Sequence, residues 1–340
     1  MSDKKKMGFF QKTKNMTDTN LLLAITMIVF FAMYIGAIIF EGKGFLKAQT
    51  FLNMLNANAA LIIASCGMSI VMITGSIDIS VGGVAALVSM CCAVYLDYHG
   101  GNVVTAIFIS LGIGLLFGLV QGYLVAYLDI QPFIVSLAGM FFARGMTTIV
   151  NTEPFNVQNE AFVKLKETRV IVPGLGSVNK LGKYVNAYVE IGVVVALILV
   201  IVLFCMLRWS KSGRNFYAVG GNQQSALMLG INVKKTKFMA HLLCSLLAGI
   251  GGFVYFMHVG SGSASHATGM EMNAIASSII GGTMLTGGVG NIIGTLFGVL
   301  SLSTIQNIVS SAGLDQAWWT GITIAAMLCL FLVIQSVVMS

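Results

Sequence analysis

Residues 272–314 read MNAIASSIIGGTMLTGGVGNIIGTLFGVLSLSTIQNIVSSAGL, a run of 43 residues without a single charge. A helix that crosses a bilayer needs about 20 predominantly apolar residues. The run is long enough for two such helices, with the glycine-rich stretch Gly287–Gly290 between them. A further uncharged run of 25 residues extends from Gln316 to Ser340. These two runs favour a chain built of membrane helices.

This composition extends over the whole chain. Of its 340 residues, 57% are hydrophobic and only 9% are charged. A soluble domain carries about a quarter charged residues and could not cover its surface with so few. We therefore expect a single transmembrane domain, residues 21–340, after a polar tail of residues 1–20. The six cysteines lie inside apolar runs and are interpreted as packing residues, not as disulfides or metal ligands.

Hydropathy divides this domain into ten apolar segments, which predict an all-α, polytopic membrane fold. The segments cover residues 21–40, 51–74, 81–96, 103–128, 133–150, 188–207, 238–258, 272–286, 292–311 and 319–338. The third and the eighth are short for a full crossing. Segments two to five and seven to ten start on opposite sides of the membrane, so a repeat between them would be inverted, as in many transporters. Each group has an early glycine-punctuated stretch, Thr74–Gly83 and Gly281–Gly294, which is the sequence hint of such a repeat.

The distribution of charge sets the expected orientation. With the N-terminus inside, the cytoplasmic segments, including loop 208–237, carry a net charge of +8, whereas the external segments, including loop 151–187, carry −1. Cytoplasmic loops of membrane proteins are enriched in Lys and Arg. Both termini and loop 208–237 are therefore predicted to be cytoplasmic, and loop 151–187 external. The cations lie at segment ends without interleaved aromatic residues, so nucleic acid is not an expected partner.

Two charged side chains fall within the predicted membrane region, where each must face protein or water. Asp78 lies between two apolar runs, and either it or Ser80 is predicted to cap the first turn of the next helix. Contact with a solute is the alternative for Asp78. Arg144 lies near the middle of residues 133–150 and is predicted to bind backbone carbonyls or an acid across a helix interface. Lining a solute path is its alternative, and a pairing with Asp78 would be compatible with either.

Loop 208–237 contains a second candidate site. Asn222 is predicted to cap a short helix, Gln223–Leu229, that ends at Gly230. Ala226 and Gly230 fall on one face of this helix, which predicts a surface of small residues on which a soluble partner closes. A helix lying on the lipid surface is the alternative interpretation.

Motifs that carry chemistry are missing from the sequence. There is no G-x-x-x-x-G-K-[ST] motif, so nucleotide binding through a P-loop is not expected. Clusters of His and Cys with metal-ligand spacing are also missing, and the four histidines are scattered. We expect no catalytic centre, no metal and no cofactor in this chain.

Three stretches together resemble the permease subunits of sugar-importing ABC transporters, the ribose, galactose and galactofuranose class. They are Ser76–Gly83, Tyr217–Val233, and Ala274–Thr283 followed by Thr286–Gly290, and their order and spacing resemble the class over residues 20–338. Residues 133–145 and Trp318-Trp319-Thr320 are most similar to a galactofuranose-type permease. The chain departs from the class at Ser76, where glycine is usual, and at Asn273, where aspartate is usual.

The resemblance implies a permease of the bacterial cytoplasmic membrane that imports a monosaccharide beside a second permease subunit, either a homologous chain or another copy. ATP would be bound by separate cytoplasmic subunits, and an external solute-binding protein would deliver the sugar. The residues implied for coupling to the ATPase are Tyr217, Gly221, Asn222, Ala226, Gly230 and Asn232. Those implied for the solute path are Asp78, Ser80, Arg144 and Asn273.

Two other functions stay open at this point. One is branched-chain amino-acid import, because motifs of spans seven to ten are similar in permeases of that kind. The other is an ion-coupled secondary carrier, which would need intramembrane acids or histidines as coupling sites. Only Asp78 is clearly available for that purpose.

Overall fold

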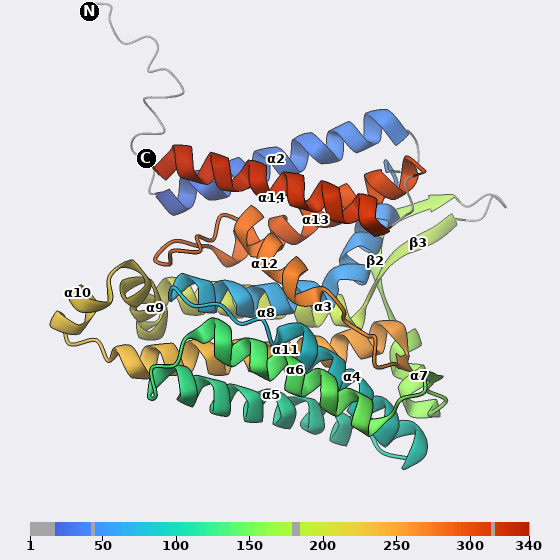
Figure 1. The fold of residues 1–340 in the computed structure, drawn as a ribbon. Coiled ribbons are helices and arrows are strands. Elements are labelled where there is room, and N and C mark those ends of the chain that lie inside the picture. Colours follow the sequence, from blue (N-terminus) through green and yellow to red (C-terminus); the bar gives the residue numbers. More distant parts are fainter. Residues whose placement is uncertain (1–17, 42–44, 179–183, 314–316, 340) are drawn as a thin grey trace, which may run out of the picture.

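A computed structural model describes residues 18–41, 45–178, 184–313 and 317–339 (Figure 1). Each of the ten predicted segments coincides with a helix in this part of the chain. The helices are α2 (Asp18–Glu41), α3 (Ala48–Ile73), α4 (Val81–Tyr98), α5 (Val103–Ala126), α6 (Pro132–Val150), α8 (Ile191–Trp209), α11 (Val233–Val259), α12 (Met270–Ile280), α13 (Ile292–Ser311) and α14 (Ala317–Met339). The predicted tail of residues 1–20 lies outside the described residues, except for the first residues of α2.

Eight helices in the described ranges are long and apolar enough to cross a membrane. Helix α12 has only 11 residues, so the prediction that the eighth segment is short is confirmed. Helix α4 has 18 residues and is the shortest of the eight, close to the about 20 that a full crossing needs. The all-α, polytopic membrane fold is therefore confirmed.

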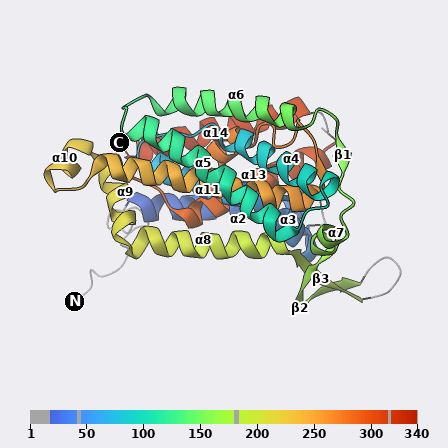
Figure 2. The ribbon, with the colours of Figure 1, turned by 90° about the horizontal axis from the view of Figure 1, so that it is seen from below.

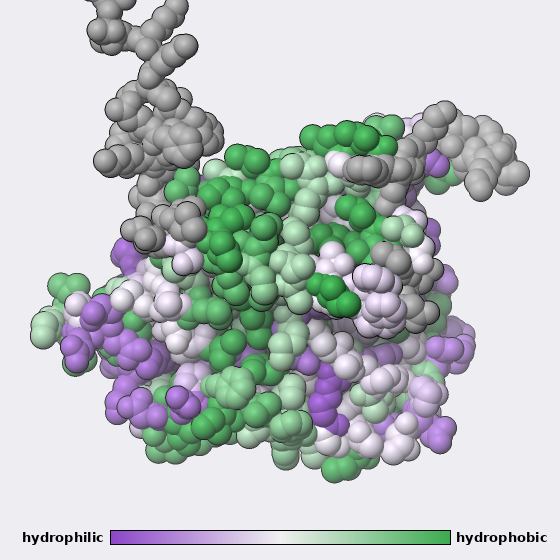
Figure 3. Space-filling view, turned by 45° about the horizontal axis from the view of Figure 1, so that its top comes forward, coloured by the Kyte–Doolittle hydropathy of each residue, from purple (hydrophilic) through white to green (hydrophobic). Residues whose placement is uncertain are grey.

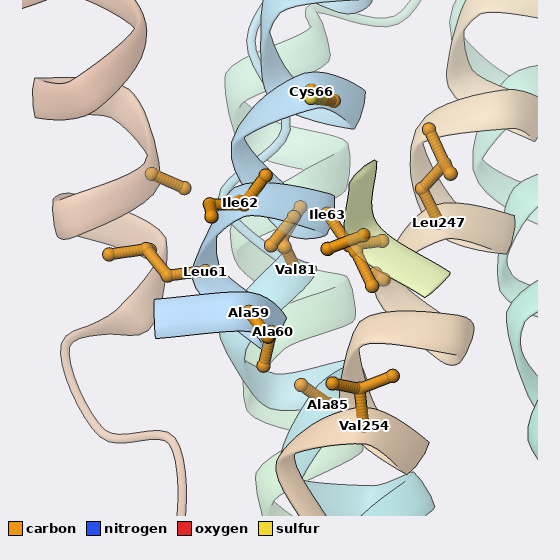
Figure 4. Close-up of a cluster of buried hydrophobic side chains, with 14 of the residues drawn as sticks. Ala59, Ala60, Leu61, Ile62, Ile63, Cys66, Val81, Ala85, Leu247 and Val254 are labelled. Atoms are coloured by element: carbon orange, nitrogen blue, oxygen red, sulfur yellow. The ribbon is translucent and has the colours of Figure 1, made fainter. Parts of the chain in front are cut away.

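Helices α3 and α11 form the centre of the bundle and run in opposite directions (Figure 1). Their contact is filled by small and branched apolar side chains that are almost completely buried, among them Ala60, Ile63 and Leu247 (Figure 4). Helix α11 packs against α4 and α5, and α3 packs in the matching way against α12 and α13. This packing is what an inverted repeat of α3–α6 and α11–α14 requires.

The sequence hint for the repeat was nevertheless wrong. In an inverted repeat the segment after α3 corresponds to the segment after α11, which is residues 260–269 and not Gly281–Gly294. The two corresponding segments begin alike, because Gly75 and Gly260 have φ angles of 75° and 76°. This left-handed conformation ends both central helices and favours glycine.

Small residues allow the helices to approach closely. Gly114 and Gly118 of α5 lie against the backbone of α11, where an added Cβ would meet Ser245 and Leu242. Gly298 of α13 lies in the same way against Ser277 of α12. Helices in lipid associate through such close packing rather than through the hydrophobic effect. The glycine spacing of these helices therefore serves packing.

The two long loops form structures at opposite ends of the bundle (Figures 1 and 2). Residues 208–237 contain α9 (Lys211–Gly221) and α10 (Gln223–Met228). The other end carries α7 (Glu160–Glu167) and the antiparallel pair β2 (Arg169–Val178) and β3 (Tyr184–Glu190), with β1 (Phe155–Asn156) paired to β4 (Ser261–Gly262). The strands were not predicted. On the face shown in Figure 3, most hydrophilic residues gather at these two ends, and hydrophobic residues cover much of the surface between them.

Candidate functional site

Helices α4 and α12 both begin inside the bundle and run toward opposite ends (Figure 1). Their first turns meet, because a Cβ atom on Gly82 of α4 would collide with the carboxylate of Glu271 in α12. The position of Arg144 in α6 shows how deep this meeting point lies. Arg144 contacts Glu271 and lies 12 residues after the start of α6, which is about 18 Å along that helix. Helices that start at membrane depth are typical of the solute sites of transporters.

Arg144 holds the segment before α12 in place. Its guanidinium group donates hydrogen bonds to the backbone carbonyls of His266 and Ala267, the second at 2.8 Å, and Nη2 lies 3.8 Å from Oε2 of Glu271. The predicted structural role, carbonyls and an acid across a helix interface, is therefore confirmed. The acid is Glu271 and not Asp78. Ala267 has a φ angle of 52°, so these bonds hold a backbone conformation that is rare for a residue other than glycine.

Glu271 is nearly buried, with 9% of its surface exposed, and no hydrogen bond to Oε2 is present in the described structure. Three positive features compensate for its charge at this depth. The first is Arg144, and the other two are the N-termini of α12 and α4, each of which carries a partial positive charge from the helix dipole. Gly82 permits the carboxylate to lie directly against the start of α4.

Asp78 and Ser80 lie just before α4, and both are completely buried. Oδ1 of Asp78 accepts hydrogen bonds from the backbone amide of Ser80 at 2.9 Å and from its hydroxyl at 2.6 Å. The Ser80 hydroxyl in turn accepts a bond from Nε2 of Gln121 at 2.9 Å. The predicted cap was wrong in this detail, because neither side chain bonds an amide of the first turn of α4. Burial also keeps both residues out of reach of a solute in this conformation.

Asn273 is partly exposed. It lines a cavity of about 270 Å³ between α3, α11, α12 and the segment before α12. The polar residues around this cavity are Asn58, Tyr255, Ser265, Thr268 and Asn273. Of the four residues predicted for the solute path, Asp78 and Ser80 are therefore buried and bonded to each other. Arg144 holds backbone carbonyls and Glu271, and Asn273 lines the cavity.

The caps predicted for the loop 208–237 are confirmed. Oδ1 of Asn222 accepts a hydrogen bond from the amide of Ser225 at 2.8 Å, and Gly230 has a φ angle of 77° just after α10. Asn232 caps α11 in the same way, through the amide of Lys235 at 2.9 Å. The short predicted helix is α10, so this segment has a fixed local structure that the sequence encodes.

Helix α9 connects this segment to the membrane helices. The Tyr217 hydroxyl donates a hydrogen bond to the carbonyl of Gly290 at 2.8 Å. Burial raises the pKa of Tyr217 to about 12, so the hydroxyl stays protonated and able to donate at neutral pH. Gly220 lies directly against the carbonyl oxygen of Ile73, which also accepts a hydrogen bond from Gly288 at 2.9 Å. The end of α3, the α12–α13 loop and α9 therefore form one contiguous unit.

The surface predicted for partner binding on α10 was wrong. Ala226 is only 1% exposed and packs inward, so it offers nothing to a partner. The large apolar side chains that point outward are Leu227, Met228 and Leu229, which are 65%, 88% and 78% exposed. We call these three residues the α10 tip. Gly221 has open space around it, with nothing within 4 Å of an added Cβ.

Sequence reasoning missed Glu271, His266 and Gly82 as members of the site. Glu271 carried a usable signal, because it immediately precedes the 43-residue uncharged run and lies two residues before Asn273. Gly82 carried no signal of its own, since its contact with Glu271 joins residues far apart in the sequence. His266 packs its ring against Tyr255 and lies 3.3 Å from the Ser89 hydroxyl.

Comparison with known proteins gives consistent matches. The family model described as "Branched-chain amino acid transport system / permease component" matches residues 50–332. The Escherichia coli inner membrane ABC transporter permease protein YjfF is 35% identical over 94% of this chain and 93% of its own. The fructose import permease protein FruG of Bifidobacterium longum is 34% identical, over 83% and 81%. The ribose import permease protein RbsC of Escherichia coli is 32% identical, over 80% and 81%. No solved structure matches the chain.

Proposed function

The chain belongs to the family of permease components named for branched-chain amino acid transport systems, and we propose that it is the permease subunit of an ABC importer for a monosaccharide. The observation that carries this proposal is the likeness to permeases named for fructose and ribose import, which extends over at least 80% of both chains. The protein is a multi-pass membrane protein. Because residues 133–145 resemble a galactofuranose-type permease, sugars of that type are candidate substrates.

The cavity at Asn273 favours a sugar over an amino acid. When a zwitterionic amino acid is withdrawn from water, its ammonium and carboxylate groups need opposite charges or several oriented hydrogen bonds to compensate them. Among the described residues that line the cavity, none is charged. A neutral polyhydroxylated solute needs only hydrogen-bonding groups and apolar surface, and both are present there.

The α10 tip is the proposed docking surface for a separate ATP-hydrolysing subunit. Three large apolar side chains on a short capped helix form a compact projection that fits a cleft in a soluble protein. A second permease subunit would cover part of the membrane surface, and an external solute-binding protein would dock at the opposite end, where α7 and the β2–β3 hairpin lie.

The orientation belongs to this proposal and has a direct test. Cysteine introduced at Glu160, an exposed residue at the start of α7, is expected to react with a membrane-impermeant maleimide in intact cells. Cysteine at Lys211, at the start of α9, is expected to react only after permeabilisation. The parent chain, with its six cysteines, supplies the background. The reverse pattern of labelling would overturn the proposed orientation and place the α10 tip outside.

The function is tested with the assembled complex in proteoliposomes. The chain is co-expressed with its companion permease and ATPase, and uptake of ribose, fructose and galactose is measured with the solute-binding protein present. We expect ATP-dependent uptake of at least one monosaccharide and ATPase activity that the loaded binding protein stimulates. Uptake that is independent of ATP, or stimulation by branched-chain amino acids alone, would contradict the proposal.

Substitution at the α10 tip tests the docking surface in the same complex. Met228→Asp places a charge in an apolar contact, so we expect about a tenfold loss of co-purified ATPase or more, with normal membrane insertion. Gln224→Asp is the matched control, because it adds the same charge to an exposed position of the same helix. Equal retention of the ATPase by both variants would show that the tip is not the docking surface.

A further inference from the structure

The cavity at Asn273 lies at the point where the fold departs from continuous membrane helices. Its walls come from α3, α11, the segment before α12, and the first turn of α12. Asn58 lies two residues beyond Asn56, whose side-chain oxygen accepts a hydrogen bond from the backbone amide of Glu190 just before α8, and Tyr255 lies four residues before the end of α11. The cavity therefore lies near the end of the bundle that carries α7 and the β2–β3 hairpin. Its polar side chains need hydrogen-bond partners, so its open side must face protein or water.

Several polar atoms around the cavity have no partner within the chain. In the described structure no hydrogen bond engages the side-chain amide of Asn273 or the hydroxyl of Tyr255. The amide nitrogen of Asn58 bonds the carbonyl of Met54 at 2.8 Å and the hydroxyl of Ser303 at 2.9 Å, which fixes the side chain and leaves its oxygen free. An amide both donates and accepts, as a sugar hydroxyl does, so the two are complementary.

The chemistry of the walls restricts the occupant further. Arg144, which bonds the carbonyl of the lining residue Ala267, and Glu271, which follows the lining residue Met270, are committed to each other and to backbone carbonyls. Ala57, Ala60, Leu61 and Met270 supply apolar surface, which suits the C–H faces of a sugar ring. A volume of about 270 Å³ is slightly below the usual range of about 300–1,000 Å³ for small-molecule sites, so the cavity suits a molecule no larger than a single small ring.

We propose that this cavity is a binding subsite for a neutral monosaccharide on its way through the membrane, in which Asn273 and Tyr255 bond hydroxyl groups of the sugar. The proposal rests on the proposed transport function and adds the contact residues. Asn273 is then a specificity-determining residue, because its amide both donates and accepts hydrogen bonds. An ionised carboxylate at this position would only accept them. The fixed side chain of Asn58 completes the polar side of the subsite.

The test compares sugar recognition by Asn273→Leu and the parent chain in the proteoliposome complex. We expect the KM for uptake of the best transported monosaccharide to rise about tenfold, since about 1.4 kcal/mol of hydrogen bonding corresponds to tenfold. A panel of monodeoxy analogues adds a readout that a merely structural role would not change. For at least one analogue that the parent chain transports less well than the full sugar, we expect the variant to transport the analogue and the full sugar equally well. Affinity of the solute-binding protein for the sugar should stay unchanged, because that protein is a separate chain.

Asn53→Leu is the matched control, since it removes an exposed asparagine of α3 that does not line the cavity. If Asn273→Leu fails to insert, Asn273→Gln is tested in its place and judged by the same criteria. Glutamine keeps both polar atoms of the amide but displaces them. Unchanged KM and unchanged discrimination in an inserted Asn273 variant would overturn the subsite. Equal changes in Asn53→Leu would overturn it too. Absence of monosaccharide uptake by the parent complex would instead overturn the proposed function itself.

Discussion

Arg144→Met is expected to abolish most of the folded, membrane-inserted protein. The substitution removes the only positive side chain that contacts Glu271 in the described structure, and it leaves the carbonyls of His266 and Ala267 without their donors. Breaking a buried ion pair by removing one partner costs about 3–5 kcal/mol, because the other charge stays buried and unpaired. Such a loss is a large fraction of the stability of an ordinary domain.

The measurement is the fraction of monodisperse protein after detergent extraction, together with its thermal unfolding temperature. Arg144→Met with Glu271→Gln is expected to recover part of the lost stability, since the unpaired charge is then gone while the carbonyls stay without donors. Arg144→Lys is expected to be intermediate, because a single ammonium group cannot hold two carbonyls and a carboxylate as the planar guanidinium does. A stable Arg144→Met protein would show that the pair does not hold the start of α12.

Gly220→Ala is expected to eliminate transport. An added Cβ would overlap the carbonyl oxygen of Ile73 at the end of α3 and press on the amide of Gly288. Neither is the end of a flexible side chain, so α9 must move away from α3 and from the α12–α13 loop. Overpacking of this kind costs about 1–3 kcal/mol, and the displaced helix carries the α10 tip with it.

Gly221→Ala is the matched control, because it makes the same change one residue further along, where nothing lies within 4 Å of the added Cβ. Gly221 is the last residue of α9, so alanine there should change the stability by less than the about 0.5–1 kcal/mol that is typical of a helix interior. Uptake and retention of the ATPase are measured for both variants. Wild-type transport by Gly220→Ala would contradict the contact between α9 and α3, whereas transport lost in both variants would show that α9 tolerates no added methyl group.

Most of the membrane architecture could be predicted from the sequence, because it depends on local properties. Hydropathy placed all ten helices, since each must satisfy its own backbone hydrogen bonds in lipid. Asn222 and Gly230 were assigned correctly, since a cap involves residues within one turn. One prediction that failed, the partner surface on α10, concerns the direction of a side chain in space. Ala226 was placed on the right helix, but its side chain is buried, because α10 packs against α9, which a single short helix does not reveal.

What the sequence determined by itself is an all-α membrane domain with a short eighth helix, a capped helix between spans six and seven, and a buried arginine that needs acceptors. Only the tertiary structure decided that Arg144 meets Glu271 and not Asp78, that Asp78 is sealed by Ser80, and that Asn273 lines a cavity. The physical reason is that a charge at membrane depth must be compensated, while the partner that compensates it depends on which helices begin inside the bundle. Two such starts, at Gly82 and Glu271, come together only when the two halves of the chain pack against each other.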